Sequence, residues 1–236
     1  MIMWTLAVRN LMFERGVNLR PHTHLDRAII GSYSYCARHA TVLSSTIGRY
    51  CSIGYKSEIG VAWHDVTKVT TSPAILHNVS FMDYSGYIPL RRHQLLADGE
   101  ISSNIIIGND VWIGCHCIFP KDVTIGHGAV IGAGSIITQD VPPYAIVAGV
   151  GGGENSHGII KRYRFPDEVI SDLLELNWWD YDLPKMIAQG IKVPTKNIKD
   201  FITFMRTTAT GSNSSHCPIL GTTSIPSTQT PLRSTK

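Results

Sequence analysis

The sequence contains no long hydrophobic segment of the kind that crosses a membrane. No apolar run among its 236 residues approaches the ~18 residues needed to span a bilayer. The first residues, MIMWTLAVRNLMFERG, are apolar but are interrupted by Arg9 and Glu14, and they show neither a basic lead nor a small-residue cleavage site. These absences argue against a membrane partner, and we expect a cytoplasmic protein.

Excess charge and paired cysteines are also missing. The 21 Lys and Arg exceed the 18 Asp and Glu by only three, too few to predict a nucleic-acid partner. Five cysteines form an odd set in a chain too large to need disulfides, which suits a reducing compartment. Cys115 and Cys117 bracket His116, but a structural zinc site normally has a second pair of ligands, and none is present. We therefore predict no metal.

What the sequence does contain is a six-residue repeat. Within IIIGNDVWIGCHCIFPKDVTIGHGAVIGAGSIITQDV, residues 105–141, Ile-Gly pairs stand only at multiples of six, and two further apolar residues occupy the same grid. Helices and single strands produce other periods. A period of six is typical of a coil with three short flat sides, in which one aliphatic side chain per side points inward and the following glycine relieves crowding at the turn. The grid residues are Ile107, Ile113, Phe119, Ile125, Ile131 and Ile137.

A rougher copy of the repeat precedes residue 60. Ile47, Ile53 and Ile59 are six apart and each precedes a glycine, whereas the spacing slips by one between Val42 and Ile47. We interpret both stretches as one β-helix over residues 28–160, all-β with a small α part, with a loop at 61–104 inserted at one corner. Residues 1–27 are expected to form a separate N-terminal segment. Long loops of this kind are more often functional than idle.

The C-terminal third changes character. The segment FPDEVISDLLELNWWDYDLPKMIAQ predicts helix, with Pro166 at the first helical position and one apolar stripe. Trp178 and Trp179 are expected to dock this helix on the side of the coil or on a neighbouring subunit. We assign 161–205 to this helical segment. Residues 206–236 are rich in Ser, Thr and Pro and poor in large apolar groups, which indicates a disordered tail.

The sequence resembles the hexapeptide-repeat acyltransferases, and most of all their xenobiotic and polysaccharide acetyltransferase branch. The resemblance rests on the Ile-Gly grid, on NDVWIG and IGAGSIITQDVPPYAIVAG, and on RYRFPDEVISDLLELNWWDYD. It rests also on His64, which stands eight residues before Ser72 in TTSPA. It implies a left-handed parallel β-helix, a homotrimer with active sites between subunits, and acetyl-CoA as the co-substrate.

The resemblance also implies site residues. His64 matches the family's general base, which takes the proton of the acceptor hydroxyl during direct acetyl transfer. Cys115 and Ala133 match coenzyme contacts made through backbone groups, and Thr138 matches the family's threonine beyond them. A proline and a basic residue usual in the family are replaced here by GGGENSHG, so Lys161 is the best remaining partner for the coenzyme phosphates.

Several functions remain open. The form TTSPA favours O-acetylation of a sugar in surface-polysaccharide biosynthesis, because antibiotic-inactivating members typically carry an aromatic residue after that proline. The alternative is an O-acetyltransferase of antibiotics such as chloramphenicol or a streptogramin. A metal enzyme of the γ-carbonic-anhydrase type would need three convergent histidines, whereas His116 and His127 are eleven residues apart. A non-catalytic scaffold is the remaining possibility, suggested by the missing basic residue.

Overall fold

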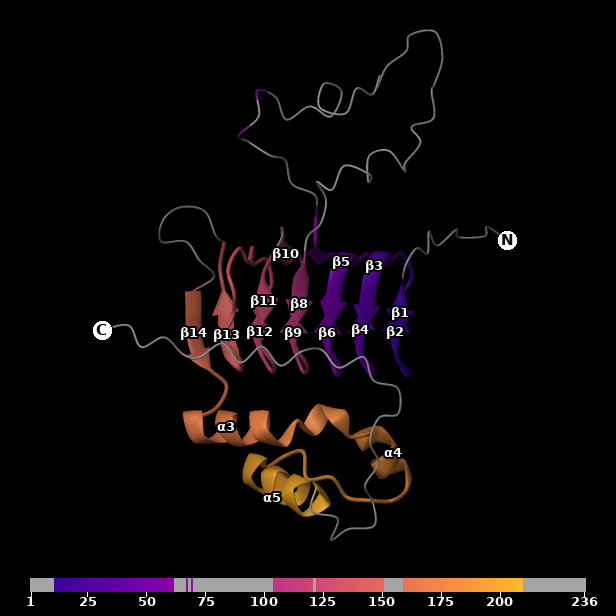
Figure 1. Ribbon diagram of the computed structural model, residues 1–236, viewed down its shortest axis with the longest axis vertical. Coiled ribbons are helices and arrows are strands. Elements are labelled where there is room, and N and C mark those ends of the chain that lie inside the picture. The colour runs from indigo at the N-terminus through magenta and orange to yellow at the C-terminus, as the bar shows by residue number, and fades with distance from the viewer. Residues whose placement is uncertain are drawn as a thin grey trace, which may run out of the picture.

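The computed structural model of the protein describes residues 11–61, 67, 69, 104–120, 122–150 and 159–209. Short strands stack side by side into one long coil, and helices lie along one flank of the stack (Figure 1). The predicted left-handed parallel β-helix is confirmed, with about six turns.

Fourteen strands build the coil among the described residues, and most are only two residues long. Those before the inserted segment are β1 (Met12–Phe13), β2 (Asn18–Leu19), β3 (His24–Ile30), β4 (Tyr35–Cys36), β5 (Thr41–Ile47), β6 (Ser52–Ile53) and β7 (Glu58–Ile59). Those after it are β8 (Ile105–Ile107), β9 (Trp112–Ile113), β10 (Ile118–Phe119), β11 (Thr124–Ile125), β12 (Val130–Ile131), β13 (Ala145–Ala148) and β14 (Ile159–Tyr163).

Each strand pairs with the strand one coil away, and the pairing is parallel everywhere except between β13 and β14. Three pairs, β5–β8, β6–β9 and β7–β10, join the coils on either side of the inserted segment. Ile53 thus lies beside Ile113, although sixty residues separate them in sequence. The repeat therefore continues in space as if the insertion were absent.

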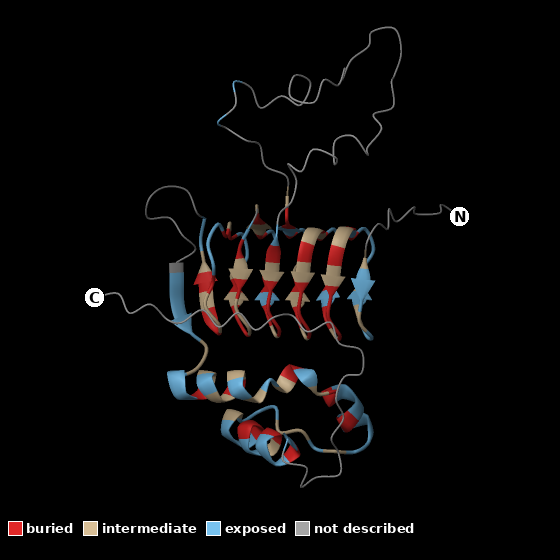
Figure 2. Ribbon diagram, in the orientation of Figure 1, coloured by how far each residue is buried: buried red, intermediate tan, exposed pale blue. Residues whose placement is uncertain are grey.

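The interior of the coil is filled by the predicted grid residues. Figure 2 shows buried residues recurring at the same place in successive strands. Every grid position between 107 and 137 is at most 1% exposed, and the early positions Cys36 and Val42 are fully buried as well. Burial of one aliphatic side chain per side gives roughly 1.5–3 kcal/mol each, so stacked coils stabilise one another.

The one-residue slip in the early repeat has a structural cause. β3 and β5 are seven residues long and bend across a corner, where Arg27 and Ser44 adopt positive φ angles of 49° and 45°. Five residues instead of six then separate the buried Val42 from the buried Ile47. A corner made within a continuous strand consumes one residue fewer than a separate turn.

The coil also begins earlier than residue 28. β1 pairs with β3, and β2 pairs with β4, so the described part of the predicted N-terminal segment supplies strands of its own. Leu11, Val17 and Leu19 pack against the buried core. These residues do not follow the Ile-Gly pattern, which is why the repeat alone did not reveal them.

Three columns of stacked turns form the corners of the coil, and we call them corners I, II and III. From the second turn of corners I and II onward, backbone hydrogen bonds join each turn to the next. Corner I consists of turns 14–17, 31–34, 48–51, 108–111, 126–129 and 142–145; corner II of turns 20–23, 37–40, 54–57, 114–117 and 132–135; corner III of residues 26–28, 43–45, 60–61, 104, 120, 122–123 and 138–141.

Glycine at the corners is required by the close approach of neighbouring coils. A Cβ added at Gly54 would stand 2.5 Å from the carbonyl carbon of Gly114, and a Cβ at Gly114 would stand 2.5 Å from the backbone nitrogen of Ala133. Side-chain carbons do not approach backbone this closely, so the predicted role of the Ile-Gly glycines is confirmed at these positions.

The C-terminal segment forms helices, but not one continuous helix. α3 (Asp167–Leu176) follows Pro166, which is the N-cap rather than the first helical residue. Asn177 adopts a left-handed conformation with φ 44° and ends α3. A 3₁₀ turn, η1 (Trp178–Asp180), then leads to α4 (Leu183–Ala188) and α5 (Ile198–Ala209). α5 extends four residues past the predicted boundary at 205.

The helices dock on corner I. Trp178 lies against Tyr50, with ring centroids 5.2 Å apart, and Trp179 is buried. The Tyr50 hydroxyl donates a hydrogen bond of 2.6 Å to the Tyr181 carbonyl. The sequence left two docking sites open, the side of the coil and a neighbouring subunit. The tryptophan segment packs on the side of the coil within its own chain.

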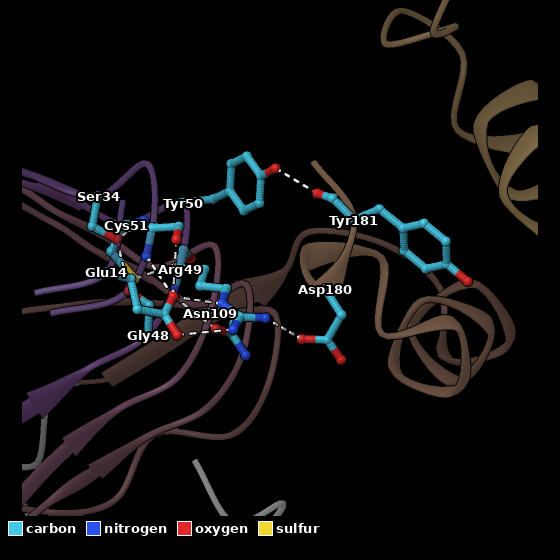
Figure 3. A network of polar contacts seen from close by, with 10 residues as sticks. Glu14, Ser34, Gly48, Arg49, Tyr50, Cys51, Asn109, Asp180 and Tyr181 are labelled. Atoms are coloured by element: carbon cyan, nitrogen blue, oxygen red, sulfur yellow. Dashed lines mark hydrogen bonds and ion pairs between the residues drawn. The ribbon is translucent and has the colours of Figure 1, made fainter. Parts of the chain in front are cut away.

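A buried arginine completes this attachment (Figure 3). Arg49 Nε lies 2.7 Å from a Glu14 carboxylate oxygen, and Arg49 Nη1 lies 2.7 Å from Asp180 of η1. Burial alone would raise the pKa of Glu14, but hydrogen bonds from Arg49 and from the Ser32 backbone outweigh it, so the pKa lies below its ordinary value. The ion pair ties the first coil, the third coil and the helices together.

Among the described residues, no helix has the length and apolar character needed to cross a membrane.

Candidate active site

Cys115 and Ala133, both predicted to contact the coenzyme, occupy equivalent places in adjacent turns of corner II. Each follows an Ile-Gly pair by one residue, and the Gly134 N–H donates a hydrogen bond of 2.8 Å to the Cys115 carbonyl. Both residues are exposed. The structure therefore brings these two predicted site residues together on one edge of the coil.

The two cysteines around His116 do not share an environment. Cys115 is exposed, whereas Cys117 is buried and its Sγ lies 3.2 Å from the Gly132 carbonyl oxygen. The segment is a turn, not a strand, so alternate residues do not face the same way. Burial raises the pKa of the Cys117 thiol, which keeps it protonated and makes it a poor metal ligand.

Lys161 lies on β14, two strands beyond β12, the strand that precedes Ala133. It is exposed on β14, whose neighbour β13 pairs with it through Ala148 and Ile159. A Cβ added at Gly132 would stand 2.9 Å from the Ala148 Cβ, which places the β13 end next to the Ala133 turn. Cys115, Ala133 and Lys161 thus follow one another along the coil axis.

Thr138 stands apart from these three residues. It is exposed and directly follows Ile137, which fills the interior on the side of the coil that runs from corner II to corner III. Thr138 begins corner III, where Val141 donates a backbone hydrogen bond to Thr124. One side of the coil therefore separates Thr138 from Cys115 and Ala133 within a single chain.

His64 lies outside the described residues. The chain leaves the coil at corner III, where the Gly60 N–H donates a hydrogen bond of 2.9 Å to the Phe119 carbonyl, and it returns at Asn104. The inserted segment therefore starts and ends at the corner that carries Thr138. The predicted site residues that the structure describes fall into two groups: Cys115 and Ala133 at corner II, with Lys161 beyond them, and Thr138 at corner III.

His127 is a second histidine of the coil, and its surroundings are unlike those of a general base. Its ring lies flat on Trp179, and its Nδ1 accepts the Asn109 N–H at 2.8 Å. Burial lowers the pKa of His127 to about 4, so the imidazole is neutral at pH 7. His127 belongs to corner I and His116 to corner II, an arrangement that does not converge on a metal ion.

Sequence reasoning missed a set of exposed basic and aromatic side chains at corner II, on the N-terminal side of Cys115. Arg38, Tyr55 and Lys56 occupy the turns that precede the Cys115 turn along the coil axis. A signal was present: Tyr55 follows Ile53-Gly54 in the same way that Cys115 follows Ile113-Gly114. Aligning the turns by the Ile-Gly grid would have found them.

Comparisons with known proteins identify the family to which the chain belongs. Residues 104–139 match the family model described as bacterial transferase hexapeptide (six repeats). A chloramphenicol acetyltransferase of Agrobacterium fabrum (strain C58 / ATCC 33970) is 30% identical over 214 residues, which are 81% of this chain and 94% of that relative. The chain belongs to the hexapeptide-repeat acyltransferases. That relative is an acetyltransferase, and this protein is one as well.

Other relatives match over shorter stretches. A chloramphenicol acetyltransferase of Klebsiella aerogenes is 47% identical over 97 residues, 41% of this chain and less than half, 43%, of that protein. Galactoside O-acetyltransferase of Escherichia coli (strain K12) is 54% identical over 59 residues, 25% of this chain and 29% of that protein. A hexapeptide-repeat acetyltransferase of Vibrio cholerae O1 biovar eltor, solved with acetyl coenzyme A, is 23% identical with a TM-score of 0.47, covering 66% of this chain and 72% of that one.

Proposed function

We propose that the protein transfers the acetyl group of acetyl-CoA to a hydroxyl group of a sugar, in the biosynthesis of a surface polysaccharide. The observation that carries this proposal is the stacking of Cys115 and Ala133 in adjacent exposed turns. A hydrogen bond of 2.8 Å from the Gly134 N–H to the Cys115 carbonyl oxygen joins the two turns. The small side chains of Cys115 and Ala133 leave backbone groups at these two positions accessible to an extended ligand such as pantetheine. Amide groups of such a ligand can bind to backbone as an added strand would.

The coenzyme would lie along corner II with its phosphates toward Lys161. Lys161 is exposed on β14, two strands beyond β12 and on the C-terminal side of Ala133. An ammonium group on a flexible stem attracts phosphate as a point charge and does not require a fixed geometry. The thioester end of the coenzyme would then lie on the N-terminal side, near Cys115.

His64 is proposed as the general base. It would accept the proton of the acceptor hydroxyl while that oxygen attacks the thioester carbonyl, and the proton would then pass to the departing thiolate sulfur. The products are an acetyl ester and free coenzyme A, so no covalent intermediate on the enzyme is needed. An imidazole suits this role because its ordinary pKa lies near neutrality.

A homotrimer would bring the two groups of site residues together. Corners II and III lie at opposite ends of one side of the coil, so the corner III group of one subunit can meet the corner II group of the next. The side that carries β4, β6, β9, β12 and β13 presents an outward row in aligned register, which is apolar or aromatic except at Ser52: Tyr35, Ser52, Trp112, Val130 and Ile146. Trp112 is 58% exposed, and exposed apolar rows of this kind mark interaction surfaces.

The second candidate acceptor is chloramphenicol. It is favoured by the Agrobacterium relative, which carries that name and aligns over 94% of its own length. Chloramphenicol also offers a hydroxyl, so the donor site and the base would be used in the same way. The two candidates differ only in the acceptor.

The test is coenzyme A release, measured with a thiol reagent on the full chain with acetyl-CoA and a panel of sugars, chloramphenicol and a streptogramin. Turnover of sugars is expected, and turnover of the drugs alone would replace the first candidate with the second. His64→Ala should lower kcat by about 100- to 10,000-fold with little change in the KM for acetyl-CoA. His216→Ala, near the C-terminal end of the chain, serves as the matched control; a His64→Ala enzyme that kept its rate would remove His64 from the mechanism.

A further inference from the structure

Corner II carries a strip of basic and aromatic side chains on the N-terminal side of Cys115. The side chains belong to four consecutive coils, and all of them are exposed. We call this set the corner II strip; it consists of Arg20, His22, Arg38, His39, Tyr55, Lys56 and His116.

The rings of the strip form a continuous ladder. His22 and His39 stack with centroids 4.8 Å apart and planes 6° from parallel. Tyr55 meets His39 edge-on at 5.6 Å and His116 edge-on at 5.8 Å. The Lys56 ammonium lies 5.4 Å from the centre of the Tyr55 ring. With strands about 4.8 Å apart, three steps extend the ladder over roughly 15 Å along the coil axis.

The distribution of acidic residues sets this corner apart from the other two. None of the five turns of corner II contains Asp or Glu, whereas corner III carries Asp26, Asp122 and Asp140. Corner I carries Glu14 and Asp110, each of which is bound by an arginine. Positive charge on corner II is therefore not balanced within the corner.

The cations of the strip lack ionic partners in the part of the chain that the structure describes. Arg20, Arg38 and Lys56 form no ion pair there, in contrast with Arg49 and Arg164, which bind Glu14 and Asp110. The only carboxylate next to the strip in sequence is Glu58, on the side of the coil that follows Lys56. Clustered, unneutralised positive charge raises the local concentration of anions and favours their binding.

The position of the strip relative to the donor indicates what it binds. This step rests on the proposed function, in which the coenzyme extends from Cys115 toward Lys161 and its thioester lies near Cys115. The acceptor hydroxyl has to reach the thioester, so the acceptor occupies the corner II edge on the opposite side of Cys115 from the coenzyme phosphates. That edge is the corner II strip.

We propose that the corner II strip binds an acidic glycan, a sugar acceptor bearing carboxylate or phosphate groups. The ladder is long enough for more than one sugar unit, the cations complement the negative groups, and the Tyr55 ring offers a flat apolar surface. This acceptor class differs from chloramphenicol, which carries no net charge.

The test uses two probes that have the same hydroxyl groups: trigalacturonic acid, and its trimethyl ester, in which three neutral methyl esters replace the three carboxylates. Binding of each to the full chain is measured by titration calorimetry, and acetyl transfer by coenzyme A release. The acid is expected to bind about tenfold more tightly than the ester at low salt, and the difference should shrink as sodium chloride screens the charges.

Two charge-matched double variants test whether the tighter binding of the acid depends on the corner II strip. Arg38→Gln with Lys56→Gln should weaken binding of the acid about tenfold and leave the ester and the KM for acetyl-CoA unchanged. Lys196→Gln with Lys199→Gln removes the same charge from exposed sites at the start of α5 and should change neither probe. Circular dichroism and the thermal midpoint establish that each variant is folded.

Each contrary result has one meaning. Equal binding of acid and ester overturns the proposal, and so does an equal loss in the α5 double variant, which would show a general charge effect. A raised KM for acetyl-CoA in the Arg38/Lys56 variant would assign the strip to the coenzyme. If no sugar and no drug releases coenzyme A, the proposed function fails, while the calorimetric difference between the probes still decides whether the strip binds acidic glycans.

Discussion

The His127 imidazole lies flat on the Trp179 indole, with ring centroids 4.5 Å apart and an angle of 15° between the planes. His127 belongs to corner I of the coil and Trp179 to the 3₁₀ turn between α3 and α4. The stack joins the helical segment to the coil at a titratable group. It excludes water from the ring, which is why the pKa of His127 falls to about 4.

This stack makes stability depend on pH. Between pH 4 and 6.5 the unfolded chain binds a proton at His127 that the folded chain does not, so the free energy of unfolding falls as pH falls through this window. His127→Gln should remove this pH-dependent contribution to the free energy of unfolding, which amounts to up to roughly 3 kcal/mol. Urea unfolding at pH 7, 6, 5 and 4 measures it, with His216→Gln as control. Parallel curves for wild type and His127→Gln would contradict the prediction.

The buried Arg49 should be required for the stability of the docked helices. Arg49→Met leaves the Glu14 carboxylate, 12% exposed, without its cation and should lower the free energy of unfolding by about 3 kcal/mol. Adding Glu14→Gln should recover part of this loss, because it removes the unpaired charge. Chemical denaturation measures both variants. In comparison, Arg206→Met breaks a pair whose arginine is 53% exposed and should cost less than about 1 kcal/mol.

Gly114 and Gly134 offer a matched test of crowding between coils. Gly114→Ala places a Cβ 2.5 Å from the Ala133 nitrogen and should cost about 3 kcal/mol, with a raised KM for acetyl-CoA because the Cys115 and Ala133 turns must separate. A Cβ added by Gly134→Ala would have no atom within 4 Å. This substitution should therefore cost only the strain of the positive φ angle, about 1–2 kcal/mol. Similar losses for the two variants would show that close packing between turns is unimportant.

Cys115 should be the thiol that reports coenzyme binding. Cys36 and Cys51 are buried and their pKa values are raised to about 12, so neither supplies thiolate at pH 8. In a Cys217→Ser background, iodoacetamide should label Cys115 alone, and coenzyme A should slow the labelling in proportion to its occupancy. Mass spectrometry of the labelled peptides measures this, with pantetheine as a shorter competitor. Labelling that is indifferent to coenzyme A would place the coenzyme elsewhere.

The architecture of the coil follows from the six-residue repeat alone. A six-residue period cannot be satisfied by a helix or a single strand, so the period alone assigns the grid residues from Ile107 to Ile137 to the interior. The glycine after each isoleucine was equally determined, because a Cβ at Gly114 would overlap the next coil. Helix at 167–176 followed from its apolar stripe, but its end at Asn177 did not, because a left-handed residue leaves little trace in the composition.

The repeat does not show which turns are neighbours in space; the three-dimensional fold sets that. Periodicity gives the place of a residue within its own coil, but the long insertion after Gly60 hides which coils are neighbours in space. Tyr55 lies against His116 because β6 pairs with β9 across that insertion. The same pairing gathers the charges of corner II, and docking of the helices on corner I covers His127 with Trp179. These relationships depend on strand register between distant segments, and register is set by packing of the whole coil.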